Sequence, residues 1–571
     1  MDKHDIAKIL DEIALLLEIQ GDNPFKIRAY ERAARSIENL DADIHEVIKK
    51  GSLRDIPGIG EKIAEKIETL VKTGKLPYYI DLKASIPKGV LEFLKIPGLG
   101  AKKAKILYDK LGLKSIEELK KAAQKNLIAD LPGFGEKSQK KILDSLDKLL
   151  SYNKRHLWWD AESIAEPILE GLKKLKEVDR VEVAGSFRRK LETVGDLDFL
   201  VATKKPKAVM DFFTTQKWVS EVLNKGEAKS SIRLKNGMQA DLRVIPDKSY
   251  PFAELYFTGS KEHNIKLRER ALSMGYHLNE YSLDPLKIKP KAEKDVYQAL
   301  KLSYIPPELR EDMGEIEAAA VGKLPKLIEE KDILGAFHCH TTYSDGHNTL
   351  EEMVKRADEL NWAYIGIADH SKSSFQANGM QLDRLEEQLA AIKKLNLSGK
   401  YKAHIFAGLE CDIMTNGKLD FADSVLKELD YVIVSIHRSF TLSQKDQTKR
   451  LIKAIENPYT TMVAHPTGRL LLKREPYAID IDKVIDACIA NNKIMELNGN
   501  PMRLDLDWRY WHKASQKGLK CAINPDAHSV HDLEYVRAGV NIARKGWLEK
   551  KHVVNSLPLD QIKKLLNQKG L

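Results

Sequence analysis

Cysteine is scarce in this chain, and long apolar runs are absent. The four cysteines all fall within residues 331–571, and no two stand in a Cys-x-x-Cys spacing. They are Cys339, Cys411, Cys488 and Cys521. So few cysteines exclude a disulfide scaffold and favour a reducing, cytoplasmic setting. No stretch reaches the roughly 18 consecutive apolar residues of a membrane helix, and the opening segment MDKHDIAKILDEIA lacks a signal-peptide core. We therefore expect no association with a membrane.

The chain also lacks a strong excess of charge. Its 571 residues hold 93 Lys and Arg against 83 Asp and Glu, a net charge of +10, which permits a polyanionic partner without requiring one. The hydrophobic fraction of 43% is ordinary for globular proteins and excludes a collagen-like or wholly disordered chain. At about 100–200 residues per domain, the length predicts roughly three to five domains. Eleven of the sixteen histidines lie within residues 331–571, which suggests metal binding there.

One glycine-rich phrase occurs three times in the first quarter of the chain. It reads IPGIG at 56–60, IPGLG at 96–100 and LPGFG at 131–135, and each copy precedes a lysine-bearing helical stretch. Glycine lets backbone amides point outward, and the N-terminus of the next helix adds partial positive charge, so each hairpin can hold a phosphate. The phrase resembles the helix-hairpin-helix motif, which binds duplex backbones without reading sequence. We expect contacts to DNA at Gly58, Gly60, Gly98, Gly100, Gly133 and Gly135.

The first copy has two further features. The segment NPFKIRAY (23–30) leads into a predicted helix, and Lys62 and Lys66 lie one turn apart on the helix after the hairpin. One interpretation is a solvated face that binds phosphate. The other is that one lysine forms a Schiff base with an abasic sugar, which requires a partly desolvated amine of lowered pKa. The residues alone leave both interpretations open.

Three aspartates follow on two predicted strands. VEVAGSFRR (181–189) is followed by GDLDFLV (195–201), and MQADLRVI (238–245) forms the second strand. Alternation along a strand places Asp196 and Asp198 on one face, about 7 Å apart. With Asp241 on the other strand, they predict a site where divalent cations support two-metal phosphoryl transfer.

These motifs resemble the palm of the family X DNA polymerases. YFTGS (256–260), followed by Asn264 and Arg268, resembles the nucleotide pocket of that family, and residues 23–67 resemble its amino-terminal lyase domain. The resemblance extends over about residues 1–315. It implies that Asp196 and Asp198 hold both metal ions. It also implies that Asp241 binds the catalytic metal and helps to activate the primer 3′-hydroxyl.

The same resemblance implies the remaining contacts to substrate. Ser186 and Arg189 would bind the β- and γ-phosphates, with Gly185 allowing close approach of the backbone. Tyr256 and Phe257 would exclude a 2′-hydroxyl beside Gly259. Asn264 would contact the base edge, and Arg268 the template strand. Lys66 would be the Schiff-base lysine, with Lys26 and Tyr30 in the pocket for the 5′-phosphate.

The last 240 residues alternate short apolar runs with helical stretches. Seven such units at roughly 30-residue spacing predict a barrel with chemistry at the carboxyl ends of its strands, and nearly every run ends in a His, Asp, Glu or Asn. HCHTTYSDG (338–346), IADHS (367–371), GLECD (408–412), SIH (435–437), AHP (464–466) and NPDAH (524–528) resemble the PHP (polymerase and histidinol phosphatase) domain. The resemblance implies up to three metal ions in a distorted (β/α)7 barrel. The implied ligands are His338, His340, Asp345, His370, Glu410, His437, His465, Asp526 and His528.

Several details of this barrel stay open at the level of sequence. His347 lies close to Asp345 and competes with it as a ligand. Cys339, between two ligands, points to the opposite face, where we expect it in the core. Arg438 and Arg469 either hold substrate phosphates or are ordinary surface arginines. A mixed nitrogen and oxygen ligand set suits Zn²⁺, Mn²⁺ or Fe²⁺.

The whole pattern predicts a multidomain chain: α-helical helix-hairpin-helix domains, an α+β nucleotidyltransferase palm and thumb, and an α/β barrel. The expected boundaries are 1–85 (lyase-like), 86–150 (fingers-like), 151–246 (palm), 247–315 (thumb), 316–332 (linker) and 333–571 (PHP). We expect a cytoplasmic, monomeric DNA polymerase that uses Mg²⁺ or Mn²⁺ and deoxynucleoside triphosphates to fill gaps or nicks in duplex DNA during base excision repair. The barrel would act as a 3′→5′ exonuclease, with abasic-site endonuclease and 3′-phosphatase reactions as further candidates.

Three alternatives remain. The barrel could be a small-molecule phosphatase, which the fusion to DNA-binding hairpins argues against. The chain could be a non-enzymatic scaffold for DNA ends, which the carboxylate triad argues against. The polymerase site could belong to a template-independent nucleotidyltransferase.

Overall fold

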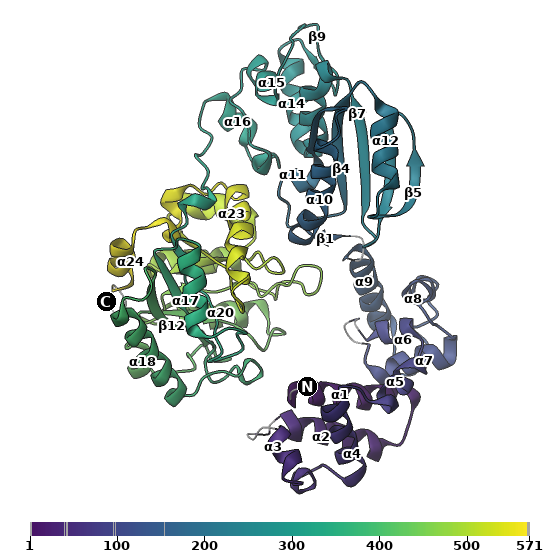
Figure 1. Ribbon diagram of the computed structural model, residues 1–571, viewed down its shortest axis with the longest axis vertical. Helices are drawn as coiled ribbons and strands as arrows, with labels where there is room; N and C mark the ends of the chain where they lie inside the picture. The colour runs from purple at the N-terminus through teal and green to yellow at the C-terminus, as the bar shows by residue number, and fades with distance from the viewer. Residues whose placement is uncertain are drawn as a thin grey trace. The chain divides into compact units, whose positions relative to one another are not determined.

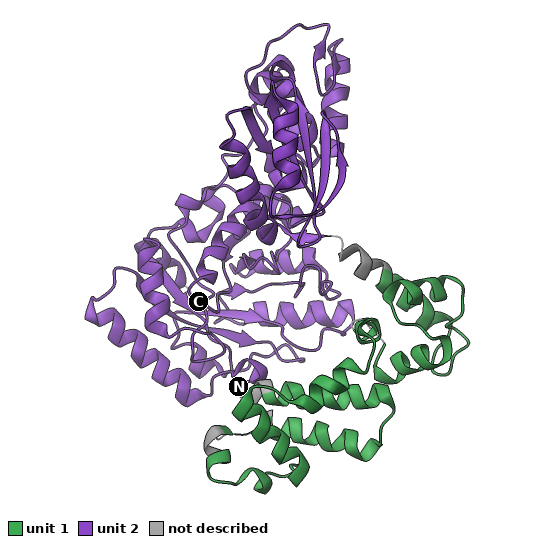
Figure 2. Cartoon of the chain, turned by 45° about the vertical axis from the view of Figure 1, so that its right-hand side comes forward, with its two compact units in different colours: residues 1–153 green, residues 154–571 purple. Residues whose placement is uncertain are grey.

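The computed structural model describes residues 3–38, 40, 44–94, 96, 99–152 and 155–567. The chain divides into two compact units, residues 1–153 and 154–571 (Figure 2). None of the helices in this described part is long and apolar enough to cross a lipid bilayer.

In the first unit, the regular elements that the described residues form are all helices (Figure 1). They are α1 (Lys3–Gln20), α2 (Pro24–Glu38), α3 (Ile44–Lys49), α4 (Glu61–Thr73), α5 (Pro77–Ala84), α6 (Lys88–Phe93), α7 (Ala101–Leu111), α8 (Ile116–Gln124) and α9 (Glu136–Tyr152). Apolar residues at helical spacing, such as Leu10, Ile13 and Leu17 of α1, are buried in one shared core.

The three glycine hairpins each open a helix, as predicted. Gly60 and Gly100 are the residues that precede α4 and α7, and Gly135 precedes α9. Gly58 and Gly133 have φ angles of +92° and +81°, a left-handed backbone that other residues adopt only with strain. Gly98 lies outside the described residues.

The second unit begins with a five-stranded sheet whose strand order is β2-β4-β7-β6-β5. The strands are β2 (Val178–Val183), β4 (Asp196–Thr203), β5 (Val219–Lys225), β6 (Lys229–Leu234) and β7 (Gln239–Ile245). A separate short pair joins β1 (His156–Leu157) to β3 (Thr193–Val194). Helices α10 (Trp158–Lys173) and α12 (Pro206–Thr215) bury their apolar faces against the five-stranded sheet.

A helical layer follows the sheet. It holds α13 (Tyr250–Thr258), α14 (Lys261–Ser273), α15 (Glu293–Ala299) and α16 (Glu315–Ala320), with a small hairpin of β8 (His277–Leu278) and β9 (Leu283–Asp284). The one-turn helix α11 (Gly185–Arg188) stands between β2 and β3 along the chain. Residues 155–325 are called the sheet half below.

The rest of the second unit, residues 333–567, is a barrel of seven parallel strands paired in chain order. They are β10 (Gly335–Ala336), β11 (Tyr364–Ile367), β12 (His404–Asp412), β13 (Tyr431–Ser435), β14 (Met462–Val463), β15 (Ile494–Asn498) and β16 (Lys520–Asn524). A parallel bridge between Cys339 and Ala527 joins the chain just beyond the first and last strands. The predicted seven-unit barrel is therefore confirmed.

The barrel is covered by helices because its strands are apolar on both faces: every residue of β13 is buried, for example. The helices are α17 (Leu350–Glu359), α18 (Leu382–Ser398), α19 (Asp423–Leu426), α20 (Gln444–Ile455), α21 (Ile481–Ala490), α22 (Trp508–Gln516), α23 (Val536–Lys545) and α24 (Leu559–Leu566). Ile562 and Leu566 of α24 pack into one cluster with Phe337, Tyr364 and Tyr431. All four cysteines are buried and unpaired, and Cys339 is a core residue as expected.

Candidate functional sites

The three aspartates meet on two neighbouring parallel strands. Asp198 of β4 lies directly opposite Asp241 of β7, and Asp196 lies two residues before Asp198 on the same face. Partial burial, followed by the charges of Asp196 and Asp241, raises the pKa of Asp198 to about 6. Carboxylates held this close repel one another, so a bound divalent cation would stabilise the group.

Lys229 of β6 is a member of this site that the sequence analysis missed. Its ammonium lies 2.6 Å from Asp241 Oδ2, and Gln239 donates to Oδ1 of the same carboxylate at 3.0 Å. Burial opposes ionisation of Asp241, but the hydrogen bonds from Lys229 and Gln239 outweigh it and hold the pKa below its usual value. Lys229 and Asp241 are twelve positions apart in the chain, so their contact can be recognised only when the pairing of β6 with β7 is known.

The turn before β4 fits closely against the aspartates. Gly185, the first residue of α11, has a φ of +64°, and a Cβ built on it would lie 2.9 Å from Asp198 Oδ2. A side chain at this position would therefore collide with a carboxylate of the site.

Arg189 is held at the boundary between α11 and the helical layer. Its Nε donates to Glu311 at 2.9 Å, and one terminal nitrogen donates to the carbonyl of Thr258 at 2.6 Å. A Cβ on Gly259 would lie 3.0 Å from that arginine, so the YFTGS segment and Arg189 are neighbours.

The other predicted nucleotide contacts lie on α13 and α14. The rings of Tyr256 and Phe257 meet edge to face at 5.2 Å. The side-chain amide nitrogen of Asn264 donates to the Tyr256 carbonyl at 2.7 Å, and Arg268 Nε donates to the Asn264 carbonyl at 3.3 Å. Ser186, between Gly185 and Arg188 on α11, is half-buried beside the aspartates' strand.

A buried charge network behind Arg189 was not predicted. Arg188 and Arg310 both bind the carboxylate of Glu293, at 2.8 and 2.7 Å, and Arg188 also reaches Glu254 at 2.9 Å. Arg310 is fully buried. This network joins α11 to α13 and α15, because a buried charge is stable only when it is fully paired.

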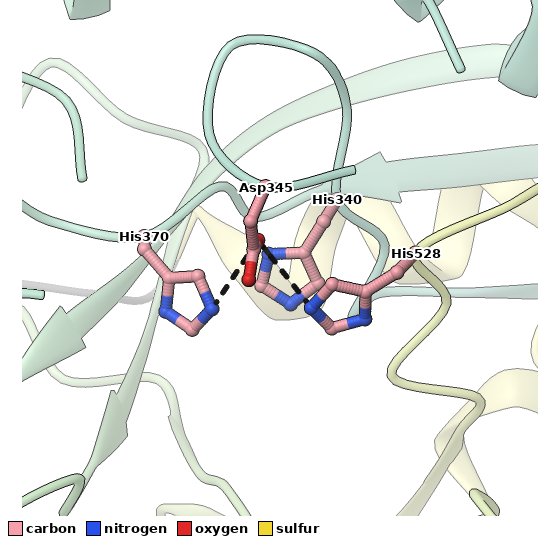
Figure 3. A group of neighbouring side chains, drawn as sticks. All are labelled: His340, Asp345, His370 and His528. Atoms are coloured by element: carbon pink, nitrogen blue, oxygen red, sulfur yellow. Dashed lines mark ion pairs between the residues drawn. The ribbon is translucent and has the colours of Figure 1, made fainter. Parts of the chain in front are cut away.

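The nine predicted barrel ligands come together at the carboxyl ends of the strands. Their donor atoms form four overlapping groups among the described residues, each with all its atoms within 4.8 Å of one another. The groups are His340, Asp345, His370 and His528; His338, His340 and Asp526; His338, Glu410 and His465; and His370, Glu410 and His437. Figure 3 shows the rings of the first group gathered around the Asp345 carboxylate, whose Oδ1 lies 3.4 Å from His528 Nε2 and 3.6 Å from His370 Nε2. His347 is exposed to solvent and belongs to none of these groups.

The donors fit metal ions chemically. Buried atoms of His338, His340, His370, Glu410 and His465 have no hydrogen-bond partner within the described protein, which is costly unless a ligand satisfies them. Mixed imidazole and carboxylate donors suit first-row divalent metals.

Two buried carboxylates support the ligands from behind, and the sequence analysis did not assign them. Glu496 of β15 lies 2.8 Å from His338 Nδ1, and it accepts from the backbone of His465 at 3.0 Å. Asp412, at the end of β12, lies 3.0 Å from His437 Nδ1. Such contacts fix ring orientation and tautomer in metal sites. Asp412 belongs to the GLECD motif, and Glu496 belongs to the apolar run Ile494–Asn498. A carboxylate in such a run can either bind a metal ion or support a residue that binds one, and sequence alone does not distinguish the two roles.

A cavity of about 370 Å³ opens onto the barrel ligands. Arg438, Arg474 and Arg503 line it, together with Phe375 and Phe440. Arg503 lies 3.0 Å from Asp526, and Phe375 is 69% exposed. Cationic and aromatic groups around a metal site suit a nucleic-acid strand, whose phosphates and bases they can bind.

Arg469 has neither of the roles considered for it. It is 7% exposed and donates to Asp507 at 2.5 Å and to the carbonyls of Arg503 and Leu504. It does not line the cavity.

In the first unit, Lys66 is half-buried beside two stacked tyrosines. Its ammonium lies 4.8 Å from the centre of the Tyr78 ring and 6.0 Å from that of Tyr30. Burial, with the charges of Lys26 and Lys62, lowers the pKa of Lys66. Lys26 is paired with Asp22 at 2.7 Å, and its ammonium lies 5.7 Å from the Tyr78 ring.

Known families match the chain along most of its length. Residues 1–76 match a helix-hairpin-helix domain, 90–148 a SAM-like helix-hairpin-helix tandem, 159–245 the DNA polymerase beta palm, 253–311 the DNA polymerase beta thumb and 336–500 the PHP domain.

Whole proteins are similar as well. The chain is 37% identical to the DNA polymerase/3′-5′ exonuclease PolX of Bacillus subtilis over the full length of both. A probable phosphatase of Thermoanaerobacter is 28% identical over 41% of this chain and 94% of its own. Rat DNA polymerase lambda is 25% identical over 54% of this chain and 56% of its own.

Proposed function

The chain belongs to the family X DNA polymerases that carry a C-terminal PHP domain, and we propose that it fills short gaps in DNA during base excision repair and trims DNA 3′ ends in its barrel. It is an enzyme that uses DNA, deoxynucleoside triphosphates and divalent metal ions. We place it in the cytoplasm, since its four buried, unpaired cysteines suit a reducing compartment. We further propose that it acts as a monomer.

The observation that carries the polymerase assignment is the pairing of Asp198 with Asp241 on adjacent parallel strands, beside the Gly-Ser turn. Mg²⁺ or Mn²⁺ ions held by Asp196, Asp198 and Asp241 would neutralise charge on the triphosphate and supply Lewis acidity.

The residues of the chain position the reactants. Ser186 and Arg189 bind the β- and γ-phosphates, and Asp241 lies on the side of the primer 3′-hydroxyl. Tyr256 and Phe257 pack edge to face as a wall against the sugar. The 3′-oxygen then bonds to the α-phosphorus in line as the bond to pyrophosphate breaks. Catalysis by the protein is mostly positioning and charge.

For the barrel, we propose hydrolysis of the terminal phosphodiester of a DNA strand. The nine-donor group would hold Zn²⁺, Mn²⁺ or Fe²⁺, which supply Lewis acidity toward a phosphoryl group. Arg438, Arg474 and Arg503 hold phosphates, and the exposed Phe375 offers a stacking surface for an unpaired base. A frayed or single-stranded 3′ end is therefore a better substrate than a fully paired one.

The test uses a duplex with a one-nucleotide gap and a labelled primer, incubated with Mn²⁺ and with or without deoxynucleotides. We expect extension with nucleotides and shortening without them. Extension alone would contradict the nuclease assignment. Shortening alone would contradict the assignment of the aspartates. Faster turnover of histidinol phosphate than of DNA would make the barrel a small-molecule phosphatase, and extension without a template strand would make the other site template-independent.

The surroundings of Lys66 favour one further activity. We propose that its partly desolvated amine forms a Schiff base with an abasic sugar, with Lys26 and Tyr30 near the 5′-phosphate. Borohydride should then trap the full-length chain on DNA that carries a 5′-deoxyribose phosphate. Lys66→Ala should abolish trapping, whereas the neighbouring Lys62→Ala should retain it, and equal trapping by Lys66→Ala would contradict the proposal.

A further inference from the structure

The sheet half and the barrel meet through paired charges within the second unit. The barrel supplies the cations, most of them on α23, and the sheet half supplies the carboxylates. The pairs are Arg537 with Glu162 at 2.6 Å, Arg544 with Glu308 at 2.8 Å, Lys545 with Glu311 at 2.5 Å, and Glu192 with Arg509 and Arg469 at 3.5 and 3.7 Å. Trp159 and Tyr535 add an edge-to-face ring contact at 5.4 Å. The arginine considered above as a phosphate ligand, Arg469, thus belongs to this contact.

Lys545, the last residue of α23, differs from the others in being almost completely buried, with 1% of its surface exposed. Its ammonium donates to Glu311 Oε1 and to the carbonyls of Arg189 and Glu308, the latter two at 3.1 and 3.3 Å. All three acceptors belong to the sheet half. An ammonium carries three donors, so its hydrogen-bonding capacity is filled by the other half of the unit.

Two of these contacts concern one residue of the polymerase site. Glu311 accepts simultaneously from Lys545 and from Arg189 Nε, and Lys545 also binds the main-chain carbonyl of Arg189. The side chains of Arg189 and Glu311 are only 11% and 13% exposed. Lys545 therefore fixes both the backbone of Arg189 and the carboxylate that orients its guanidinium.

The charge balance of this group has a consequence for anion binding. Two cations, Lys545 and Arg189, share the single carboxylate of Glu311, so the group keeps one net positive charge. Without Lys545, Glu311 would neutralise Arg189 alone. A guanidinium whose charge is matched by a carboxylate attracts a phosphate less strongly than one whose charge is shared.

We propose that Lys545 of the barrel is a positioning residue for Arg189, so that the affinity of the polymerase site for the triphosphate depends on the docked barrel. This inference rests on the proposed role of Arg189 in binding the triphosphate. It makes the barrel part of the machinery for nucleotide addition as well as the site of DNA hydrolysis.

The test measures single-nucleotide gap filling by full-length variants. Lys545→Met should raise KM for the deoxynucleotide about tenfold, with little change in kcat, because one charge-assisted contact supports ground-state binding. The inhibition constant for inorganic pyrophosphate, which probes the same phosphate contacts, should rise in proportion. Barrel nuclease activity on single-stranded DNA should be retained and reports that the variant is folded.

Arg537→Ala is the matched control. It removes a cation from the same helix and the same contact, but one that binds Glu162 and not Arg189. Its KM and pyrophosphate inhibition should stay near those of the parent chain. An equal rise in Arg537→Ala would assign the effect to general loosening of the contact and overturn the inference.

Arg189→Ala separates the proposed role of Arg189 in binding the triphosphate from the proposed role of Lys545 in positioning Arg189. If it leaves both constants unchanged, the proposed role of Arg189 fails. If it raises them and Lys545→Met does not, the present inference fails alone. Should Lys545→Met lose nuclease activity through misfolding, Lys545→Gln replaces it, because it removes the charge and keeps an amide donor at the buried position. It should also raise both constants, and unchanged constants in it would overturn the inference.

Discussion

At the scale of single residues, Lys66 shows how its neighbours set the chemistry of an amine. Burial is the largest effect, and it lowers the pKa of Lys66 from the ordinary lysine value of 10.5. The charge of Glu65 opposes this shift, whereas the charges of Lys26 and Lys62 add to it. The nucleophile is the neutral amine. Schiff-base trapping should therefore increase with pH and reach its midpoint below 10.5. In Lys62→Gln one like charge is removed, so the midpoint should move upward. A midpoint at 10.5 in the parent chain would contradict the desolvated site.

Glu496 supports a second prediction at this scale. Its buried carboxylate contacts His338 Nδ1, and it also accepts from Asn498 and Asn524 at 2.9 and 3.0 Å. Losing such support typically costs about 10–100-fold in metal affinity or activity. We expect Glu496→Gln to reduce the metal content of the barrel after dialysis, measured by mass spectrometry, and to reduce nuclease activity to a similar extent. Gap filling should be unchanged. Full retention of the metal in Glu496→Gln would show that Glu496 contributes to packing and not to metal binding.

At the scale of elements, the turn that enters α11 is fitted to the strand beside it. Gly185→Ala would force a side chain into a left-handed position and against Asp198 Oδ2. Displacing a catalytic group by about 1 Å can cost roughly 100-fold in rate, so we expect gap filling to fall by about that factor. Gly237→Ala is a matched control: its φ is +90° in the β6–β7 turn, but a Cβ there meets nothing within 4 Å. If gap filling fell equally in both variants, the cause would be backbone strain and not the contact with Asp198.

Elements also show what could be predicted from sequence. Asp196 and Asp198 could be assigned to one face because alternation along a strand is local. The barrel units could be recognised because nearly every apolar run ends in a residue of a metal-ligand type. Lys229, Glu496 and Lys545 could not, because their roles arise from strand pairing or from contacts between segments far apart in the chain. Lys545 meets Arg189 across more than 350 positions. Arg469 was misjudged for the same reason, since its partners, Asp507 and Leu504, lie more than 30 positions away.

At the scale of the whole molecule, two metal sites of different chemistry share one chain. The sheet half offers carboxylates alone, whereas the barrel offers six imidazoles with three carboxylates. Hard oxygen donors suit Mg²⁺, and imidazole-rich sets favour transition metals. Each site also belongs to its own hydrophobic core, so we expect one site to lose its ions without unfolding the other.

Removing and restoring metal should therefore separate the two reactions. After exhaustive chelation, gap filling and shortening of the primer should both be lost. Added Mg²⁺ should restore gap filling and leave shortening near zero, whereas added Mn²⁺ should restore both. Asp198→Asn and Glu410→Gln are the paired controls, since each removes a donor from one site only: the first should lose gap filling in either metal, the second shortening in either metal. Recovery of both reactions with Mg²⁺ alone would contradict the assignment of different metals to the two sites. It would show that the imidazole-rich barrel works with Mg²⁺ and does not select its metal by donor type.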